Sequence, residues 1–396
     1  MIEYFKNLKK FNTIEVTLQI GCSLQCRYCP QKLLISNYCR QDRVRRMSFE
    51  AFAKYIDNVR TGGGIVFSGM SEPFLNADCA KMIKYAYEKG YKISLFTTLM
   101  GMKEKDLELI KDVAFDYVTL HIPDAEGNAK FVLDDAYFKV LEKFTQSVKV
   151  NNYSCHGQVH PLVMDYVDEQ LLGTSMMNRA GNLDYEELET YAPKGKVVCQ
   201  IGTIESPGCW APEVLPDGTV LLCCMDYGMR HVLGNLNENS ANEILNGREA
   251  CRVMKGMEDD GIDILCRSCG SAVEVGKLGA SRLCEKLKSD VESPVLNKIR
   301  HAKNICIYGL GKYFRDTYFS LKYNEAIQAN LFSDGNIGET DYVTEGKIIV
   351  PERMSDYEDL LVITWVKNPW GINKRLEELG IKNYMNVVDV LSEARE

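Results

Sequence analysis

The chain has 396 residues, a formal net charge of −8 and 15 cysteines. Hydrophobic residues make up 45% and charged residues 26%, which excludes wholesale disorder. There is no basic stripe for nucleic-acid backbone and no apolar run of about 18 residues for a membrane span. The first residues lack the apolar core of a signal peptide, so we expect a cytoplasmic protein. Its cysteines should then pack, catalyse or bind metal, because disulfides do not persist there.

Apolar strands alternate with amphipathic helices over residues 1–185. The expected strands are Ile14–Gly21, Gly64–Ser68, Lys92–Thr98, Tyr117–Ile122 and His156–Met164. Helices are expected at Ser48–Val59, capped by Ser48, and at Asn76–Lys89, between Asn76 as cap and Gly90. This repetition predicts an α/β fold with a parallel sheet, open or closed into a barrel, and active residues at the carboxyl ends of its strands.

Two further segments differ in character. Residues 186–290 are rich in cysteine and turn signals, and Pro216-Asp217-Gly218 predicts a hairpin between two short strands, in a small α+β domain. A helical stretch at Val275–Ser289 leads to residues 298–396, where strands, a glycine turn and a late helix at Ile372–Leu379 predict a Rossmann-like α/β domain.

A compact cysteine cluster follows the first strand. Cys22, Cys26 and Cys29 lie on one short loop and can bind three corners of a cubic iron–sulfur cluster. One iron would then lack a protein ligand, which is the open position that a catalytic centre needs. The alternative is a zinc knuckle or a redox pair, for which Cys39 is the nearest fourth ligand.

The stretch GCSLQCRYC, residues 21–29, resembles the signature of the radical S-adenosylmethionine (SAM) enzymes. The resemblance implies a partial six-stranded (β/α)6 barrel over residues 10–185, with the free iron of the cluster chelating SAM. The reduced cluster would split SAM into methionine and a 5′-deoxyadenosyl radical, which takes hydrogen from a substrate inside the barrel. An electron donor such as flavodoxin or ferredoxin is also implied.

Three more stretches extend the resemblance. Residues 68–73, SGMSEP, are similar to the family's Gly-Gly-Glu-Pro loop, with Ser71 in place of one glycine. Residues 96–99, FTTL, end a strand where the family often has Thr-Asn-Gly, and residues 178–182, NRAGN, resemble a stretch that helps to hold SAM. The residues that the resemblance assigns to SAM are Tyr28, Gly69, Ser71, Glu72, Thr97, Arg179 and Gly181.

A second group of cysteines lies in residues 186–290. Cys209, Cys223 and the pair Cys266 and Cys269 can close a four-thiolate site for zinc or for a complete iron–sulfur cluster. This stretch resembles the SPASM/twitch extension of radical SAM enzymes, and the resemblance implies one auxiliary 4Fe-4S cluster. Either Cys199 or Cys224 could replace one of these ligands.

Candidate bases and the terminal glycine turn complete the expectations. His121 and His160 lie near strand ends, and Asp226 lies beside the auxiliary cysteines, although a lone histidine is more often structural. The turn at Gly309 and Gly311, with Asp334 after the next strand, favours a nucleotide site about as much as a domain that binds nothing.

Three functional hypotheses remain at this point. The leading one is an oxidoreductase acting on a sugar, an aminocyclitol or a nucleotide-linked sugar, because only 21 residues precede Cys22 and leave no room for a peptide-recognition domain. The second is a peptide-modifying maturase of the same superfamily. The third is a non-catalytic metal-binding interaction protein.

Overall fold

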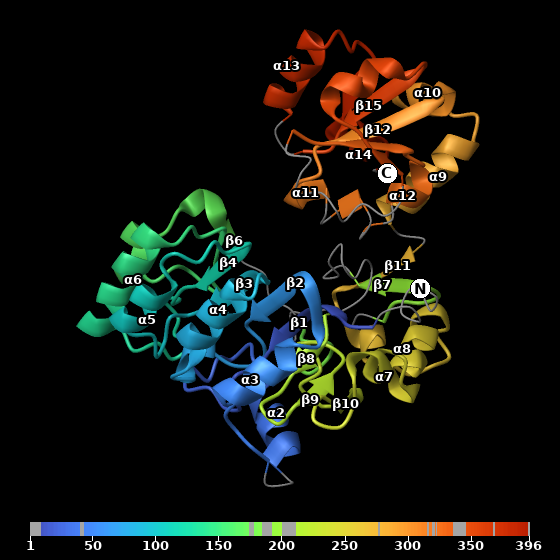
Figure 1. Ribbon diagram of the computed structural model, residues 1–396. Coiled ribbons are helices and arrows are strands. Elements are labelled where there is room, and N and C mark those ends of the chain that lie inside the picture. The colour runs from blue at the N-terminus through green and yellow to red at the C-terminus, as the bar shows by residue number, and fades with distance from the viewer. Residues whose placement is uncertain are drawn as a thin grey trace. The chain divides into compact units, whose positions relative to one another are not determined.

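The computed structural model describes residues 9–39, 43–173, 178–183, 192–199, 211–275, 278–314, 317–318, 321, 323–335, 346–366 and 369–394. The chain forms two compact units (Figure 1). The first comprises residues 1–193 and 211–271, and the second comprises residues 194–210 and 272–396. Within the described residues, no helix combines the length and apolarity needed to cross a bilayer.

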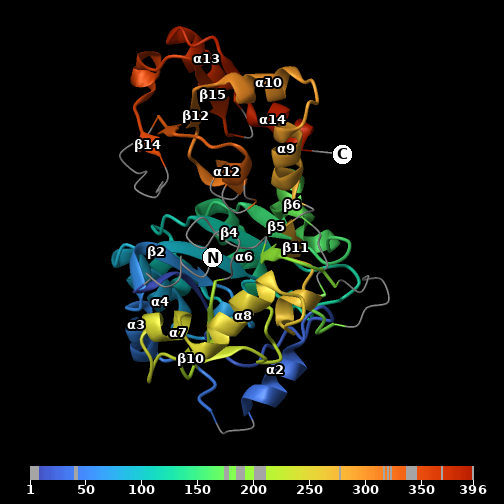
Figure 2. The same cartoon turned by 90° about the vertical axis from the view of Figure 1, so that its right-hand side faces the viewer.

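A nine-stranded sheet organises the first unit, in the order β10-β9-β8-β1-β2-β3-β4-β5-β6. Six strands run parallel in sequence order: β1 (Phe11–Val16), β2 (Val59–Phe67), β3 (Lys92–Thr97), β4 (Tyr117–His121), β5 (Asn152–Ser154) and β6 (Leu172–Gly173). The helices that connect them are α2 (Gln31–Tyr38), α3 (Phe49–Ile56), α4 (Cys79–Glu88), α5 (Glu104–Ile110) and α6 (Asp135–Ser147). Neighbouring members of the series α3 to α6 pack on one another beside the sheet (Figure 1, Figure 2). The predicted α/β fold with a parallel sheet is confirmed.

The helix caps follow the sequence in one case and depart from it in another. Ser48 caps α3 as expected, because its Oγ accepts a hydrogen bond from Ala51 N at 3.1 Å. The N-cap of α4 is Asp78 rather than Asn76. The Asn76 side chain instead donates to the carbonyl oxygens of Leu18 and Met47, at 3.0 and 2.9 Å, and so joins the start of this helix to the segments that follow β1 and precede α3.

The expectation of a strand at His156–Met164 is wrong. The fifth strand is β5, and residues Pro161–Tyr166 form a 3₁₀ helix that begins with the proline. Pro161 has no N–H to give to a strand ladder, and it suits the first turn of a helix. His160 caps this turn, since its Nδ1 accepts a hydrogen bond from Leu162 N at 3.3 Å.

The predicted hairpin forms between β8 (Glu213–Val214) and β9 (Thr219–Leu221), with Gly218 at a φ of 83°. Its first strand pairs parallel with β1, and β10 (Val232–Asn235) extends the sheet at the outer edge. The remaining helices among the described residues of the first unit are α7 (Ala241–Leu245), α8 (Arg248–Glu258) and the 3₁₀ helices Pro73–Leu75, Glu169–Leu171 and Leu265–Ser268. The segment between Cys209 and Cys223 therefore contributes a strand beside β1.

The second unit contains a five-stranded parallel sheet in the order β14-β13-β12-β15-β16. Its strands are β12 (Asn304–Tyr308), β13 (Leu331–Ser333), β14 (Lys347–Ile348), β15 (Leu360–Thr364) and β16 (Tyr384–Asn386). Its helices are α9 (Gly279–Lys288), α10 (Pro294–His301), α11 (Lys312–Phe314), α12 (Tyr323–Ala326), α13 (Trp370–Glu378), α14 (Val387–Glu393) and the 3₁₀ helix Pro351–Asp356. A separate antiparallel pair joins β7 (Val197–Cys199) to β11 (Ala272–Glu274).

Alternate residues of β12 face two different apolar cores in this unit. Ile305 and Ile307 pack with residues of α9, α10 and α14, whereas Cys306 and Tyr308 pack with residues of α13 and the 3₁₀ helix Pro351–Asp356. Helices therefore cover both faces, as Figure 1 shows for α10 and α13. A parallel sheet covered on both faces is the Rossmann-like arrangement that the sequence predicts.

Candidate active site

The loop of Cys22, Cys26 and Cys29 begins a few residues after β1 and is held by the loop that follows β4. Arg27 N donates to Asn128 O at 2.8 Å, and Lys130 N donates to Leu24 O at 2.7 Å. All three thiols are partly exposed and free of disulfides.

Burial and mutual charge act together on these thiols. Burial raises the pKa of Cys26 to about 12, and the charges of Cys29 and Cys22 add to this rise. The pKa of Cys22 is raised by burial and, to a smaller extent, by Glu72 and Cys29. The three thiols therefore lie close enough for the charge of one to raise the pKa of another. Ionisation of all three together requires a positively charged iron centre to offset this repulsion.

Among the described residues, no three His, Cys, Asp or Glu side chains converge as a single metal ion requires. A cubane cluster instead binds each thiolate at a different iron. Three neighbouring free thiols on one loop fit three corners of such a cluster.

The loop of Gly69, Ser71 and Glu72 is fastened to β1 and β3. Met70 N donates to Thr17 Oγ1 at 2.8 Å, and Ser71 Oγ donates to Gly21 O at 3.2 Å. Only Gly69 adopts a positive φ here, at 70°, so serine at position 71 meets no left-handed backbone. The replacement of the family's glycine therefore leaves this path intact.

Glu72 organises the carboxyl end of β3. Its carboxylate accepts hydrogen bonds from Thr97 Oγ1 at 2.7 Å, from Thr98 N and Oγ1 at 2.6 Å each, and from Phe74 N at 3.1 Å. Burial raises its pKa, and these hydrogen bonds oppose the rise. The two threonines thus hold the loop without the asparagine that the family often has here.

The stretch that contains Arg179 is a strained turn. Arg179, Ala180 and Gly181 have φ values of 47°, 57° and 76°, a left-handed run that costs about 1–2 kcal/mol for each residue with a side chain. Asn178 Oδ1 accepts from Ala180 N at 3.1 Å, and Asn182 Nδ2 donates to Arg179 O at 2.7 Å. These bonds stabilise the conformation, and backbone strain of this kind gathers at functional sites.

Arg179 is a positive charge near Cys29 of the first cysteine loop. Burial opposes its charge, but Tyr227, Cys224, Cys29 and Glu15 together outweigh burial and raise its pKa. The Cys29 thiol also lies 3.7 Å from Tyr227 Oη. Burial raises the pKa of this thiol, while Tyr227 and Arg179 oppose the rise. The guanidinium therefore offsets negative charge where the two cysteine-bearing segments of this unit meet.

Two carboxyl groups lie side by side next to this site. Glu15 on β1 and Glu213 on β8 are register partners. Glu15 Oε1 accepts from Gly69 N at 3.0 Å and from Ser68 Oγ, while Glu213 Oε1 accepts from Thr17 Oγ1 at 2.6 Å. Glu213 is fully buried, and within the described part of the chain its Oε2 has no hydrogen-bond partner.

Burial raises the pKa of Glu213 well above its ordinary value, and the charge of Glu15 raises it further. Glu213 therefore holds a proton under conditions in which an exposed carboxyl group would be ionised. The thiol of Cys224 is subject to the same influences, because burial and then the charges of Glu15 and Glu213 raise its pKa.

The predicted bases lie in different surroundings. His121, at the end of β4, has its pKa lowered to about 3 by burial and by the positive charges of His156 and Arg179. Its ring stacks on that of His156 at a centroid distance of 6.4 Å, and His156 in turn packs on Tyr28 at 3.9 Å. His160 is engaged as the helix cap described above.

The carboxylate of Asp226 is hydrogen-bonded to main-chain N–H groups. Its two oxygens accept hydrogen bonds from Arg230 N and His231 N, each at 2.8 Å, and burial raises its pKa. His231 Nε2 accepts from Leu265 N at 2.9 Å, so its Nδ1 carries the proton that faces Glu249 at 2.6 Å. This chain of bonds joins the loop of Cys223 to that of Cys266 and Cys269.

The NRAGN turn reaches the same two cysteine loops. Asn182 Nδ2 donates to Met225 O at 3.1 Å, and Asn178 Nδ2 donates to Ser268 O at 3.0 Å. Three of the four expected auxiliary ligands therefore lie on loops that are fastened to each other and to the Arg179 turn. The fourth, Cys209, lies outside the described residues, and Cys199 lies in the other unit.

Comparison with known proteins decides the family. A model of the radical SAM superfamily matches residues 16–144, and a model of the iron–sulfur cluster-binding (SPASM) domain matches residues 209–270. The chain belongs to the radical SAM superfamily. The matches confirm the resemblance seen in the first cysteine motif and in the hairpin segment, and with it the SAM-binding 4Fe-4S cluster, SAM and auxiliary iron–sulfur chemistry.

Solved structures to which this chain is similar include the following three. BtrN in complex with AdoMet and 2-DOIA is 17% identical over 66% of this chain and 94% of that chain, with a TM-score of 0.44. Native anSMEcpe with bound AdoMet is 16% identical over 65% and 86%, with a TM-score of 0.43. Streptococcus suis SuiB bound to the precursor peptide SuiA is 13% identical over 68% and 72%, with a TM-score of 0.41.

Sequence reasoning did not single out several residues of this radical SAM site. Glu15 and Glu213 lie on short apolar strands, and His156 lies within the mistaken strand. Thr13, Glu15 and Thr17 recur at every second position before the cysteine motif. This alternation of polar side chains is the sequence signal that could have identified Glu15, because the inner face of a barrel carries polar groups where substrate binds.

Proposed function

We propose that this radical SAM enzyme oxidises a small polar molecule, namely a sugar, an aminocyclitol or a nucleotide-linked sugar. The observation that carries the proposal is the pair Glu15 and Glu213 beside the loop of Gly69, Ser71 and Glu72, to which we assign SAM binding and which we call the SAM loop. A buried polar atom without a partner costs about 1–3 kcal/mol, and Glu213 Oε2 is such an atom among the described residues. A substrate hydroxyl or amine would satisfy it.

When bound, SAM and the iron–sulfur clusters would supply hydrogen-atom abstraction from a substrate carbon and one-electron oxidation. The chain's own residues must hold the substrate and take up the remaining proton. Glu213, which keeps its proton, donates a hydrogen bond to the substrate and orients it. Glu15 receives the hydroxyl proton, so loss of a hydrogen atom, a proton and an electron leaves a carbonyl group.

Glu15 suits the role of base better than the other candidates. A His121 with a pKa of about 3 is too weak a base to hold a proton near neutral pH. Both oxygens of Asp226 are engaged with backbone N–H groups. Glu15 accepts hydrogen bonds from Gly69 N and Ser68 Oγ of the SAM loop, and this contact supports its role as the base.

The test compares Glu15→Gln with Glu50→Gln, a control at an exposed helix start. Protein with both clusters is incubated anaerobically with SAM, reductant and polyol or aminocyclitol substrates, and products are weighed by mass spectrometry. We expect wild type and Glu50→Gln to form a product about two mass units lighter than substrate, and Glu15→Gln to lose at least about tenfold in rate while still cleaving SAM. Equal rates for Glu15→Gln and Glu50→Gln would refute the role of Glu15. Modification of a peptide, with no oxidation of the small polar molecules, would refute the proposed substrate class.

A further inference from the structure

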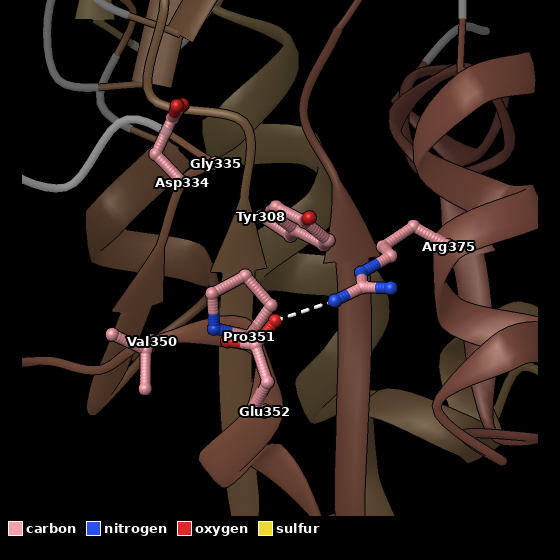
Figure 3. Close-up of a pocket in the computed structure, with 7 residues that line it drawn as sticks. All are labelled: Tyr308, Asp334, Gly335, Val350, Pro351, Glu352 and Arg375. Carbon is pink, nitrogen blue, oxygen red and sulfur yellow. Dashed lines mark hydrogen bonds and ion pairs between the residues drawn. The ribbon is translucent and has the colours of Figure 1, made fainter.

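A pocket of about 330 Å³ lies at the carboxyl end of the five-stranded sheet in the second unit. It is lined by the last residue of β12, by the segments after β13 and β14, and by one residue of α13. The main lining residues are Tyr308, Asp334, Val350, Pro351, Glu352 and Arg375, as drawn in Figure 3. None of them belongs to the radical SAM barrel or to the cysteine loops.

The topology makes this edge a ligand-binding edge. With β12 counted first, the parallel strands have the spatial order 3-2-1-4-5, so the chain reverses direction between β12 and β15. Ligands of open α/β sheets bind outside the carboxyl ends of the strands at such a reversal. The pocket combines residues from both sides of the reversal, since Tyr308 ends β12 and Arg375 follows β15.

The two glycines of the turn after β12 differ in how closely other atoms approach them. Gly309 has a φ of 99°, and a Cβ there would lie 2.5 Å from Val366 Cγ1, so packing within the chain demands glycine. A Cβ at Gly311 would meet no atom within 4 Å. The packing of the described residues therefore does not require the second glycine, which leaves space beside the turn. Asp334 Oδ2 accepts from Leu310 N at 2.6 Å and fastens the turn to the end of β13.

The charge of the pocket selects the kind of ligand. Glu352 pairs with Arg375 at 2.6 Å, and Arg375 also pairs with Glu378 at 3.3 Å, so carboxylates already balance the guanidinium. Burial and the charge of Asp334 raise the pKa of Tyr308, whereas Arg375 opposes the rise. Two carboxylates and one guanidinium give a net negative lining, which disfavours phosphate and favours neutral groups with hydroxyls.

We propose that this pocket binds the nucleoside portion of a nucleotide or of a nucleotide-linked sugar. A flat base would pack against Val350, Pro351 and the ring of Tyr308, while the carboxylates would accept hydrogen bonds from vicinal ribose hydroxyls. Figure 3 shows Tyr308 between Asp334 on one side and Arg375 on the other. The volume is at the low end for ligand pockets, which suits one nucleoside rather than a dinucleotide.

The test is equilibrium dialysis of the full chain, without SAM or reductant, against adenosine, guanosine, cytidine, uridine and 5-methyluridine. The best binder is then compared with its 5′-diphosphate and diphosphohexose, which separates a free nucleotide from a nucleotide-linked sugar. Val350→Trp should fill the pocket, and Val388→Trp on α14 is the matched control, because both valines are exposed. Val350→Phe serves as a smaller plug if the tryptophan variant fails to fold.

We expect one nucleoside to bind one-to-one at or below about 1 mM, with affinity reduced about tenfold or more by the plug and unchanged by the control. Binding that Val350→Trp leaves unchanged, including binding of adenosine in the SAM site, would overturn the proposal. The absence of binding by all five nucleosides at about 1 mM would also overturn it. Because SAM cleavage is not measured, failure here is independent of the proposed oxidation.

Discussion

Two glycines with the same backbone angle allow the packing of the SAM loop to be tested. Gly62 within β2 and Gly69 after it have φ values of 69° and 70°. Alanine at either position incurs a left-handed cost of about 1–2 kcal/mol. At Gly62 the added Cβ meets no atom within 4 Å, whereas at Gly69 it would lie 2.3 Å from Thr17 Oγ1, 2.8 Å from Glu213 Oε1 and 2.9 Å from Thr17 Cα.

The clash with Thr17 Cα involves backbone, so rotation of the threonine side chain cannot relieve it. Overpacking of this kind adds about 1–3 kcal/mol. Gly62→Ala should therefore lose about 1–2 kcal/mol of stability and Gly69→Ala about 2–5 kcal/mol. Only Gly69→Ala should displace the loop that carries Glu72.

The assay is anaerobic equilibrium dialysis with SAM, together with thermal unfolding of each reconstituted variant. We expect Gly62→Ala to bind SAM like wild type and Gly69→Ala to bind at least about tenfold more weakly, since about 1.4 kcal/mol corresponds to a factor of ten. Thr17→Ala should not rescue Gly69→Ala, because the clash with the backbone at position 17 persists. Equal SAM affinity and equal unfolding temperature for the two alanine variants would refute this reasoning.

Three further predictions concern iron, protons and the SAM loop. Cys223→Ser should reduce the iron content from about eight to about four atoms per chain. Cys224→Ser should keep about eight, because the Cys224 thiol lies beside the carboxyl pair. An equal loss of iron in the two variants would contradict this prediction and show that both cysteines are cluster ligands. The folded pKa of His121, about 3, lies below its unfolded value of about 6.5, so its contribution to stability is complete above pH 6.5 and is lost as the pH falls toward 3. His121→Gln should therefore reduce the fall in unfolding temperature between about pH 7.5 and 5.5, and an unchanged fall would contradict this assignment. Glu72→Gln would turn an amide toward the donors of Thr98, and we expect a loss of about 1.5–3 kcal/mol in SAM binding by dialysis, while wild-type affinity would exclude this role.

The elements with strong local signals could be predicted from the sequence. The strand expected at Lys92–Thr98 is β3, Lys92–Thr97, and the turn at Pro216-Asp217-Gly218 joins β8 to β9. Both depend on short-range chemistry, since apolar alternation marks a strand and glycine supplies the left-handed residue of a turn.

The parallel pairing of β8 with β1 could not be predicted. It joins a two-residue strand to one about 200 positions earlier, and nothing local encodes that partnership. The burial of Glu213 and its position opposite Glu15 depend on this pairing. An isolated glutamate in an apolar strand indicates a face turned to water, whereas in this sheet the two carboxyl groups meet each other and the SAM loop.

The central claim is tested most directly by SAM cleavage. Protein carrying both clusters is incubated anaerobically with SAM and dithionite, and 5′-deoxyadenosine is quantified by liquid chromatography and mass spectrometry, with the triple variant Cys22→Ala, Cys26→Ala, Cys29→Ala as control. We predict 5′-deoxyadenosine and methionine in equal amounts from wild type and none from the triple variant. Failure of fully reconstituted wild-type protein to form 5′-deoxyadenosine, or equal formation by the triple variant, would contradict the account.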